Sequence, residues 1–522
     1  MRNRLAFILL LCISTVLPAD EIELPTHEIY FTGQKHFEES DLQDALGVKV
    51  PSFFQFWKDD TPRIKDKLIK SIHPSLKSFF DSEGFYDAVF SIKETETTIV
   101  ITVDEKEPVR IKDINITSDY DISSMVDMKK DAIFRAADFI AVKNKIIAAL
   151  MKDGYCSYDL DTKAYVDLDK HTVDLRYVLN KGGVCTFGAL TTSGLETIDE
   201  DVIRTRVKAK EGERYSTDLI QDTSNRLYGL NAFDSVLINV DRKFYNVVPV
   251  DITFAEMEKP YHMEAGAGYD TYDGMRVLGE ITKSNFMGDA QQLKLQASWS
   301  QREQLIKLSY FKPAFMDIFG YYTDLAGNTG YSNLEYDGFK EKKAFLRAFL
   351  EHEHRRLLLR AGVALEHIEI TALDNVDPGD LSQAVNEGTF PLLYPFVDLV
   401  YDARDSKLNP KYGYYLGAHG EFGLSYDEEA SVYLKTWFEG RIIHTISDIT
   451  LSAVGKVGVL DVTNEDGLPE SKYFFGGGSF SNRAYGFREI GVIISPTEDS
   501  IYGASTMANL SLEANYPVWG DV

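Results

Sequence analysis

The second half of the chain alternates apolar and polar residues with a period of two. From about Lys259 onward this pattern recurs in segments of roughly ten residues, including residues 262–270, 293–299 and 451–459. Side chains along a strand point alternately to opposite faces, so each segment predicts a strand with one apolar and one polar face. Soluble sandwiches also alternate, but many such strands with a polar inner face are typical of a transmembrane barrel with a wet lumen. We count about 12 strands by Val522.

The N-terminus has the features of a secretory signal. Arg2 and Arg4 precede an apolar run over residues 5–17, which is followed by Pro18 and Ala19. We therefore predict a signal peptide over residues 1–19, after which the mature chain leaves the cytoplasm. Beyond it, no uncharged apolar run reaches the ~18 residues that a membrane helix needs. A membrane-spanning part must then be a closed barrel, because every backbone group in lipid needs a partner.

Composition limits the number of domains and the class of partner. With 522 residues the chain exceeds one ordinary domain. Its 29 Tyr and 31 Phe are typical of β-rich proteins with aromatic girdles at the membrane interfaces. The net charge of -26 argues against nucleic acid as a partner, because phosphate binding needs clustered Lys and Arg.

One structural unit occurs three times before residue 257. Each copy has a helix that ends in a glycine, followed by an aromatic or apolar residue and a strand; the glycines are Gly84, Gly154 and Gly229. In the first copy we expect the helix to begin with Thr61 as N-cap and Pro62 at its first position. Opening strands are expected at residues 29–33, 111–117 and 187–194. The order is β-α-α-β-β in an α+β module of about 75 residues.

This order and spacing resemble the POTRA domains, the periplasmic modules of outer-membrane assembly proteins. The best local match is in the third unit, over residues 212–219, 225–227 and 231–236. Taken singly, these residues are explained as helix caps and core. The resemblance implies that function lies in exposed strand edges, which can accept an incoming strand.

A second resemblance lies in the middle of the predicted barrel. Residues 401–416 resemble the strand-turn-strand of barrels in the BamA/TamA superfamily. A plain β-turn explains most of them: Asn409, Pro410 and Gly413 supply turn geometry, while Asp402, Arg404 and Asp405 form a charge cluster on the periplasmic side.

A glycine-rich loop over residues 474–487 carries the third resemblance. Gly477 and Gly478 belong to a glycine cluster that allows the backbone to turn at positive φ, and Arg483, at the tip of such a loop, can fold inward to meet carboxylates. Gly486 belongs to the same loop motif. The loop resembles the superfamily's signature, Arg-Gly followed by Phe or Tyr, with Arg483 and Tyr485 matching and Ala484 in place of Gly. An alanine cannot take positive φ cheaply, so the local backbone is expected to differ.

The resemblance also implies a partner for this arginine in the barrel wall. The partner is Glu513, and the alternation of residues 510–517 independently points Glu513 into the lumen. The sequence therefore predicts a buried pair of Arg483 and Glu513 that holds the loop inside. No catalytic role is expected.

Taken over the whole chain, the resemblance is closest to the TamA type of this superfamily. It implies a signal peptide at 1–19, POTRA domains at 20–107, 108–181 and 182–257, and an outer-membrane barrel from 258 to 522. Family barrels have about sixteen strands. We therefore expect the chain to lack about four strands at its C-terminus, the alternatives being a smaller barrel closed on about 12 strands or a soluble, aggregating edge.

The resemblance implies a function in the outer membrane. It predicts a factor that inserts or translocates outer-membrane proteins such as autotransporters, with a TamB-like partner anchored in the inner membrane and POTRA domains that bind partners or substrate strands. The alternatives are general barrel assembly, as in BamA, and a passive secretion channel of the two-partner type.

The remaining motifs give little information about function. His352 and His354 share a strand face but lack the spacing of a zinc site, so no metal is expected. No phosphate loop or nucleophile elbow occurs, so neither an enzyme nor a cofactor is predicted. Cys156 and Cys185 remain after signal removal; they form either a disulfide or two buried thiols.

Overall fold

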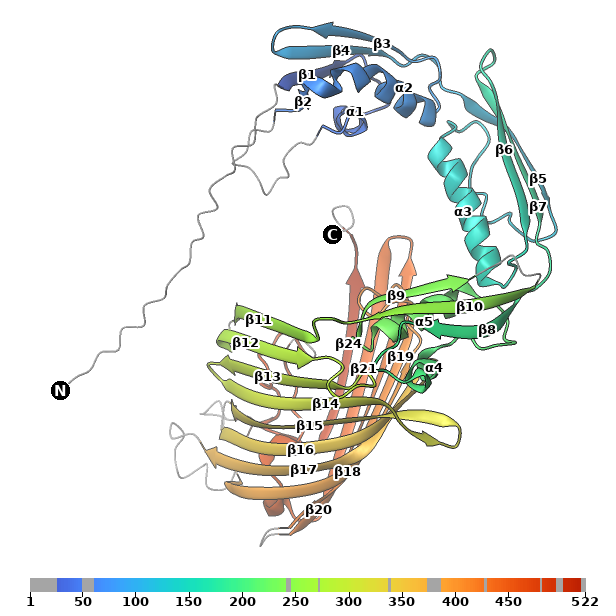
Figure 1. Cartoon of the computed structure of the whole chain (residues 1–522). Helices are drawn as coiled ribbons and strands as arrows, with labels where there is room; N and C mark the ends of the chain where they lie inside the picture. The colour runs from blue at the N-terminus through green and yellow to red at the C-terminus, as the bar shows by residue number, and fades with distance from the viewer. Residues whose placement is uncertain are drawn as a thin grey trace. The chain divides into compact units, whose positions relative to one another are not determined.

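The computed structural model describes residues 26–48, 61–240, 246–270, 273–336, 339–372, 386–426, 430–478, 481–493 and 501–517. The predicted signal peptide lies outside these ranges, as do residues 479–480 of the glycine-rich loop and residues 518–522. The chain divides into two compact units. The first comprises the first two repeats, and the second comprises most of the third repeat together with a long antiparallel sheet (Figure 1).

The first repeat is a four-stranded sheet packed against helices. Its elements are β1 (Thr26–Thr32), α1 (Glu39–Ala45), β2 (Arg63–Lys65), the 3-10 helix η2 (Asp66–Ser71), α2 (Ile72–Ser82), β3 (Val89–Glu94) and β4 (Thr98–Asp104). The strand order is β2-β1-β4-β3, with β1 parallel to β4. The buried side chains of α2, namely Ile72, Leu76 and Phe80, close the core against this sheet.

The helix that ends at Gly84 does not begin at Thr61, so this prediction is wrong. Residues 63–65 form the short strand β2, in which Ile64 lies opposite His27, and the Ile29 N–H donates to the Pro62 carbonyl at 3.1 Å. The α-helix begins only at Ile72. Because Ile64 is buried either way, the apolar pattern did not distinguish a helical turn from an edge strand.

The second repeat has one helix instead of the predicted two. It consists of β5 (Arg110–Ser118), α3 (Ala136–Lys152), β6 (Asp159–Asp167) and β7 (Thr172–Asn180), in the strand order β5-β7-β6. Residues 119–135 form turns, and their backbone bonds the start of β5: Asp131 donates to the Ile111 carbonyl and Phe134 to the Val109 carbonyl, at 2.8 and 2.9 Å. These bonds occupy groups that a helix would use.

The third repeat has the predicted β-α-α-β-β order. Its elements are β8 (Thr186–Ser193), α4 (Glu200–Arg206), α5 (Thr217–Tyr228), β9 (Phe233–Val240) and β10 (Val247–Glu256), with the strand order β8-β10-β9. The glycines that end the helices in the first two repeats, Gly84 and Gly154, have φ of 91° and 82°. In the third repeat Asn231 has positive φ instead, at 48°.

In two of the repeats, a carboxylate at the end of the last strand accepts hydrogen bonds from the loop that follows the first strand. In the first, Glu105 accepts bonds from the Lys35 and His36 N–H groups at 2.6 and 3.1 Å. In the third, Glu256 accepts three backbone N–H groups of residues 196–198 at 2.8 to 3.2 Å. Burial alone would raise the pKa of each carboxyl, but the hydrogen bonds outweigh it and lower both pKa values. No pattern in the sequence predicted these two carboxylate caps.

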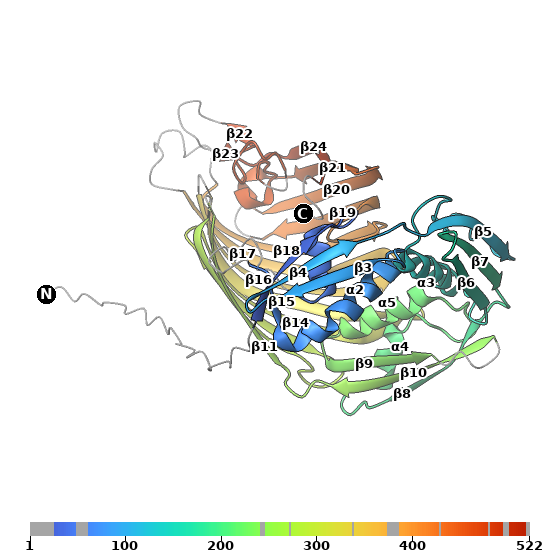
Figure 2. The same cartoon turned by 90° about the horizontal axis from the view of Figure 1, so that it is seen from above.

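The long sheet has twelve antiparallel strands among the described residues, joined in the order of the chain (Figure 2). They are β11 (Tyr261–Asp270), β12 (Gly274–Lys283), β13 (Gln292–Ser300), β14 (Glu303–Ile318), β15 (Tyr321–Glu335), β16 (Phe339–His354), β17 (Leu357–Ala372), β18 (Gly388–Asp402), β19 (Tyr412–Ser425), β20 (Ser431–Ile446), β21 (Ile449–Val462) and β24 (Thr506–Asn515). The number agrees with the predicted strand count.

The two faces of this sheet differ as the alternation predicts. One face exposes apolar side chains, including Leu359, Val363, Leu416, Phe438 and Leu510. The other face, here called the inner face, packs against residues 463–478. Phe339, Tyr394 and Tyr433 of the strands form a buried cluster with Leu468 and Phe474 of that segment. Within the described ranges, no helix is long and apolar enough to cross a membrane.

The third repeat contacts two strands of the long sheet within the second unit. Arg206 of α4 bonds Asp324 of β15 at 2.7 Å, and both side chains are largely buried. Arg226 of α5 bonds Glu353 of β16 at 2.7 Å. These two ion pairs attach the helices of the repeat to one rim of the sheet.

Candidate functional site

The candidate site is the segment between β21 and β24, residues 463–505, here called the inner loop. Its described part includes the 3-10 helices η3 (Glu465–Gly467) and η4 (Glu470–Lys472) and the short strands β22 (Val492–Ile493) and β23 (Ile501–Tyr502). It bonds the inner face: Ser431 donates to the Asn464 carbonyl at 2.7 Å, and the Phe474 ring fills the space beside Gly458. The inner loop therefore lies against the sheet.

The glycines of the inner loop are required by its backbone. Gly477 and Gly478 have φ of 93° and 89°, as predicted for the glycine cluster. A Cβ on Gly477 would lie 2.3 Å from the Gly486 carbonyl oxygen, and the Gly478 N–H donates to the Tyr485 carbonyl at 3.0 Å. Ala484 is not among the residues with positive φ, so alanine fits where the resembling family has glycine.

The structure brings Arg483 and Glu513 together. Arg483 Nη2 donates to Glu513 Oε1, from the tip of the inner loop to β24. The side chains are 67% and 33% exposed, so the prediction of a buried pair is wrong. Glu513 points to the inner face as predicted, but the described elements leave this pair open to solvent. Exposed ion pairs contribute only about 0–1 kcal/mol.

A buried ion-pair site that the sequence analysis missed lies deeper in the same loop. Lys472 Nζ lies 2.9 Å from Glu366 Oε2 of β17 and 3.4 Å from Glu421 Oε1 of β19. The lysine also lies over the Tyr394 ring, 4.0 Å from its centroid. The only sequence signal was indirect, because Glu366 and Glu421 occupy inward positions of their strands.

Further polar groups surround this lysine. Tyr394 donates to Glu366 at 2.7 Å, His419 bonds Asp398 at 2.6 Å, and Lys435 donates to the Lys472 carbonyl at 2.5 Å. A cavity of about 330 Å³ adjoins them; it is lined by Lys343, Arg347, Glu366, Ile368, Tyr394, Asp398, His419, Glu421, Lys435, Trp437, Ser471 and Lys472. The group is an ordered, mixed-charge network on the inner face.

The predicted turn in the middle of the sheet is well defined. Arg404 bonds both carboxylate oxygens of Asp402, at 2.9 and 2.8 Å. Asp405 accepts the N–H groups of Ser406 and Lys411 at 2.9 and 3.0 Å. Gly413 has φ of 117°, and a Cβ there would lie 2.3 Å from the Ala403 carbonyl oxygen. Of the predicted charge cluster, Asp402 and Arg404 thus pair with each other, whereas Asp405 binds the backbone of the turn.

Asn409 and Pro410 also belong to this turn. The Asn409 N–H donates to Ser406 Oγ at 3.2 Å. Pro410 follows and ends the turn before β19. Both fit turn geometry.

Cys156 and Cys185 are joined by a disulfide with a Cα–Cα distance of 5.9 Å. This is the first of the two states that the sequence left open. The Cys185 N–H donates to the Gly154 carbonyl at 2.8 Å beside the bridge.

His352 and His354 lie side by side on β16. Their rings stack with centroids 6.4 Å apart, and His352 Nδ1 bonds the Tyr322 carbonyl at 2.8 Å. Throughout the described part of the chain, no group of three or more His, Cys, Asp or Glu side chains is placed to hold a metal ion.

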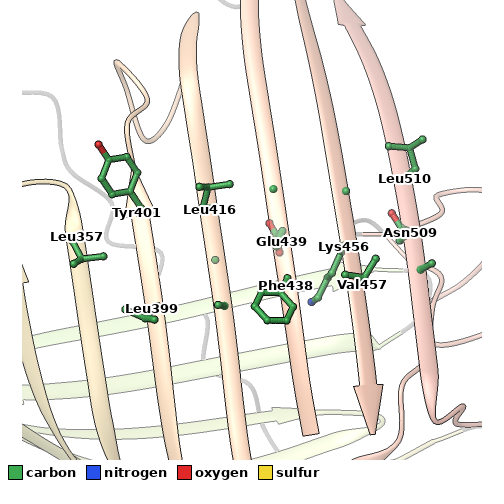
Figure 3. A pocket seen from close by; sticks show the side chains of 15 residues that line it. Leu357, Leu399, Tyr401, Leu416, Phe438, Glu439, Lys456, Val457, Asn509 and Leu510 are labelled. Atoms are coloured by element: carbon green, nitrogen blue, oxygen red, sulfur yellow. The ribbon is translucent and has the colours of Figure 1, made fainter.

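A second concavity, of about 740 Å³, crosses strands β17 to β24 (Figure 3). Most of its lining is apolar and comes from one residue or a few on each strand, including Leu357, Leu399, Leu416, Phe438, Val457 and Leu510. Gly440 and Gly455 lie opposite each other in this region and leave it hollow. These exposed apolar side chains belong to the face opposite the inner face.

Comparisons with known proteins agree with this architecture. Residues 285–521 match the family described as "Omp85 superfamily domain", and residues 107–182 and 186–256 match the POTRA family, "Surface antigen variable number repeat". The chain is 21% identical over 336 residues to the outer membrane protein assembly factor BamA of Buchnera aphidicola subsp. Acyrthosiphon pisum (strain APS), covering 62% of this chain and 54% of that protein. The chain therefore spans about half the length of this curated relative.

Two further proteins are similar to the chain. A protein of Treponema pallidum (strain Nichols), whose name includes the words outer membrane protein assembly factor, is 21% identical over 313 residues, 55% of this chain and 36% of that protein. The crystal structure of Haemophilus ducreyi BamA lacking POTRA domains 1–3 has 18% identity and a TM-score of 0.48, with 79% of this chain and 84% of that chain covered.

Repeats of this type followed by an antiparallel sheet with an inserted loop define a class of outer-membrane protein. The chain belongs to the BamA/TamA-type superfamily, in which POTRA repeats precede a β-barrel domain. It lies in the outer membrane, with its POTRA repeats in the periplasm.

Proposed function

We propose that the chain is an outer-membrane assembly factor that helps other proteins to insert into or cross the outer membrane, and that it is not an enzyme. The observation that carries the proposal is the inner loop. Leu468, Lys472 and Phe474 of this loop are buried against the inner face, so the loop occupies space that a permanently open channel would leave free. The names of two relatives of the chain include the words "assembly factor", which supports the same function.

The repeats supply edges for binding. In the three repeats β3, β6 and β9 end their sheets, and each exposes apolar side chains: Val89, Tyr165 and Leu237. An edge strand with free backbone groups can accept an extended segment of another protein. We propose that unfolded outer-membrane proteins or a periplasmic partner bind there.

The finer assignment is to the TamA type. Under it the substrates include autotransporters, and a TamB-like protein anchored in the inner membrane binds the repeats. Crosslinking from a photoreactive group at Leu237 in living cells tests the partner: a large inner-membrane-anchored protein should be captured, whereas capture of substrates alone would favour general barrel assembly.

Insertion activity can be measured directly. Liposomes that contain the chain are mixed with an unfolded outer-membrane barrel protein or an autotransporter barrel, and folding is followed by heat-modifiable gel mobility. We expect faster folding than in empty liposomes. Equal rates would contradict the proposal.

Conductance measurements distinguish an assembly factor from a passive secretion channel. In planar bilayers the proposal predicts small, infrequent openings, because the inner loop blocks the path. A large, steady conductance without any acceleration of folding would support a secretion channel instead.

A further inference from the structure

We propose that Lys472 is the residue that positions the inner loop on the sheet, through a buried ion-pair site made by Glu366 and Glu421. The side chains of the lysine and the two glutamates are 10%, 10% and 6% exposed. Arg483, the residue that the family signature points to, is far more exposed. The inference goes beyond the proposed function, because it concerns which contact holds the loop whatever the protein assembles.

The geometry of the site fits a single ammonium group. Glu366 comes from β17 and Glu421 from β19, and Tyr394 of the intervening β18 supplies its ring and its hydroxyl. One cation from the loop therefore crosslinks three neighbouring strands. A lysine stacked on an aromatic ring gains cation–π attraction besides its ion pairs.

The backbone around Lys472 is also fixed. Lys435 of β20 donates to its carbonyl at 2.5 Å, and its own N–H donates to the Pro469 carbonyl at 3.0 Å. Two residues earlier, Glu470 accepts the Gly503 N–H at 2.8 Å. The 3-10 turn that carries the lysine thus connects the sheet to the far end of the same loop.

Charge balance explains why this site should dominate. Lys472 is the lysine within ion-pair distance of both glutamates; around them, the His419 ring lies 3.4 Å from Glu421, and Lys343, Arg347 and Lys435 line the adjoining cavity. Removing one member of a buried pair leaves an uncompensated charge, which is costly, whereas an exposed pair such as Arg483 with Glu513 is screened by water. The loop should therefore open far more readily when the lysine is lost than when the arginine is lost.

Hydrogen exchange in the whole chain tests this. The protein is purified in detergent micelles, and mass spectrometry measures the exchange of backbone amides in residues 464–476. In Lys472→Met we expect exchange about 100-fold faster or more in this segment, and in Arg483→Ala an increase of less than about 5-fold. Lys407→Met, an exposed lysine in the β18–β19 turn, is the matched control and should change nothing.

A charge-balanced variant separates positioning by charge from packing. In Lys472→Met combined with Glu366→Gln and Glu421→Gln the two carboxylates that faced the lysine are removed with it, so protection should return at least tenfold relative to Lys472→Met alone. Absence of any recovery would show that the lysine acts only by filling space and would overturn the proposal. So would an effect of Arg483→Ala that equals or exceeds that of Lys472→Met.

Should Lys472→Met fail to fold, Glu366→Gln carries the test. It keeps a hydrogen-bonding group of the same shape and leaves one carboxylate facing the lysine. The proposal then expects a smaller, clearly measurable increase of exchange confined to residues 464–476. Unchanged exchange would overturn it.

Discussion

Glycines on the inner face make room for aromatic rings at the scale of single residues. A Cβ on Gly423 would lie 2.0 Å from Cε1 of the fully buried Tyr433 ring. We expect Gly423→Ala to destabilise the protein by about 1–3 kcal/mol, because a packed ring cannot shift without cost. Thermal unfolding followed by heat-modifiable gel mobility measures this.

Gly455→Ala is the matched control for that change. Gly455 lies two strands away in the same sheet, on β21, and a Cβ there would meet nothing within 4 Å. Its unfolding temperature should stay within the error of the wild type. A loss of equal size in both variants would mean that strand flexibility, and not the Tyr433 ring, sets the cost.

The two anchors of the inner loop show what could be predicted for residues. Glu513 could be found because it stands at an inward position of an alternating strand and because the family signature supplied Arg483. Lys472 could not be found, because a lysine in a loop has no periodic neighbours and its carboxylates lie on two strands far away in the sequence. The solvent exposure of the Arg483–Glu513 pair could not be predicted either, because the alternation shows which face of the sheet a side chain lies on and not how deeply it is buried.

At the scale of elements, the carboxylate caps of the repeats make stability depend on pH. The pKa of Glu256 is lowered from its ordinary value of 4.5 in the folded state, so the cap stabilises the fold above that value. The contribution is lost as the pH falls from 4.5 toward the lower folded pKa. We expect the amides of residues 196–198 to be protected at pH 7 and to lose protection over this acidic range, as measured by hydrogen exchange corrected for intrinsic rates.

The variant Glu256→Gln isolates the cap. It should lower the stability of the third repeat by about 1 kcal/mol at pH 7, because charge-assisted hydrogen bonds become neutral ones. It should also remove the acidic loss of protection. Glu258→Gln, two residues further along in an exposed position, serves as control. If both variants keep the same pH profile as the wild type, Glu256 is not the titrating cap.

Strand periodicity was more informative than helix signals at this scale. The twelve strands of the long sheet follow the alternation, because one face of each must be apolar over its whole length. The N-cap signal at Thr61 and Pro62 failed, because β1 offers backbone groups to residues 62–65 that an isolated sequence does not reveal. The missing helix of the second repeat has the same cause, since residues 131–134 bond β5 instead.

For the whole molecule, the two compact units predict how the chain behaves when it is cut. The first two repeats each have a core of their own, around Phe80 and Ile101 in one and around Ile146 and Tyr177 in the other. A fragment of residues 20–257 should therefore be soluble and unfold cooperatively, with circular dichroism of a mixed α/β protein. An aggregated or unstructured fragment would contradict the repeat architecture.

Within that fragment the third repeat should be the weakest part. In the second unit Arg206 pairs with Asp324 and Arg226 with Glu353, and the cut at residue 257 removes both carboxylates. A largely buried arginine that loses its carboxylate retains a desolvation cost, so about 2–4 kcal/mol of local stability should be lost around α4. Hydrogen exchange of residues 200–206 in the fragment and in the whole chain compares the two states, with residues 142–150 of α3 as internal reference. Equal protection of α4 in both would mean that the repeat is stable without the sheet, and that these ion pairs only orient it.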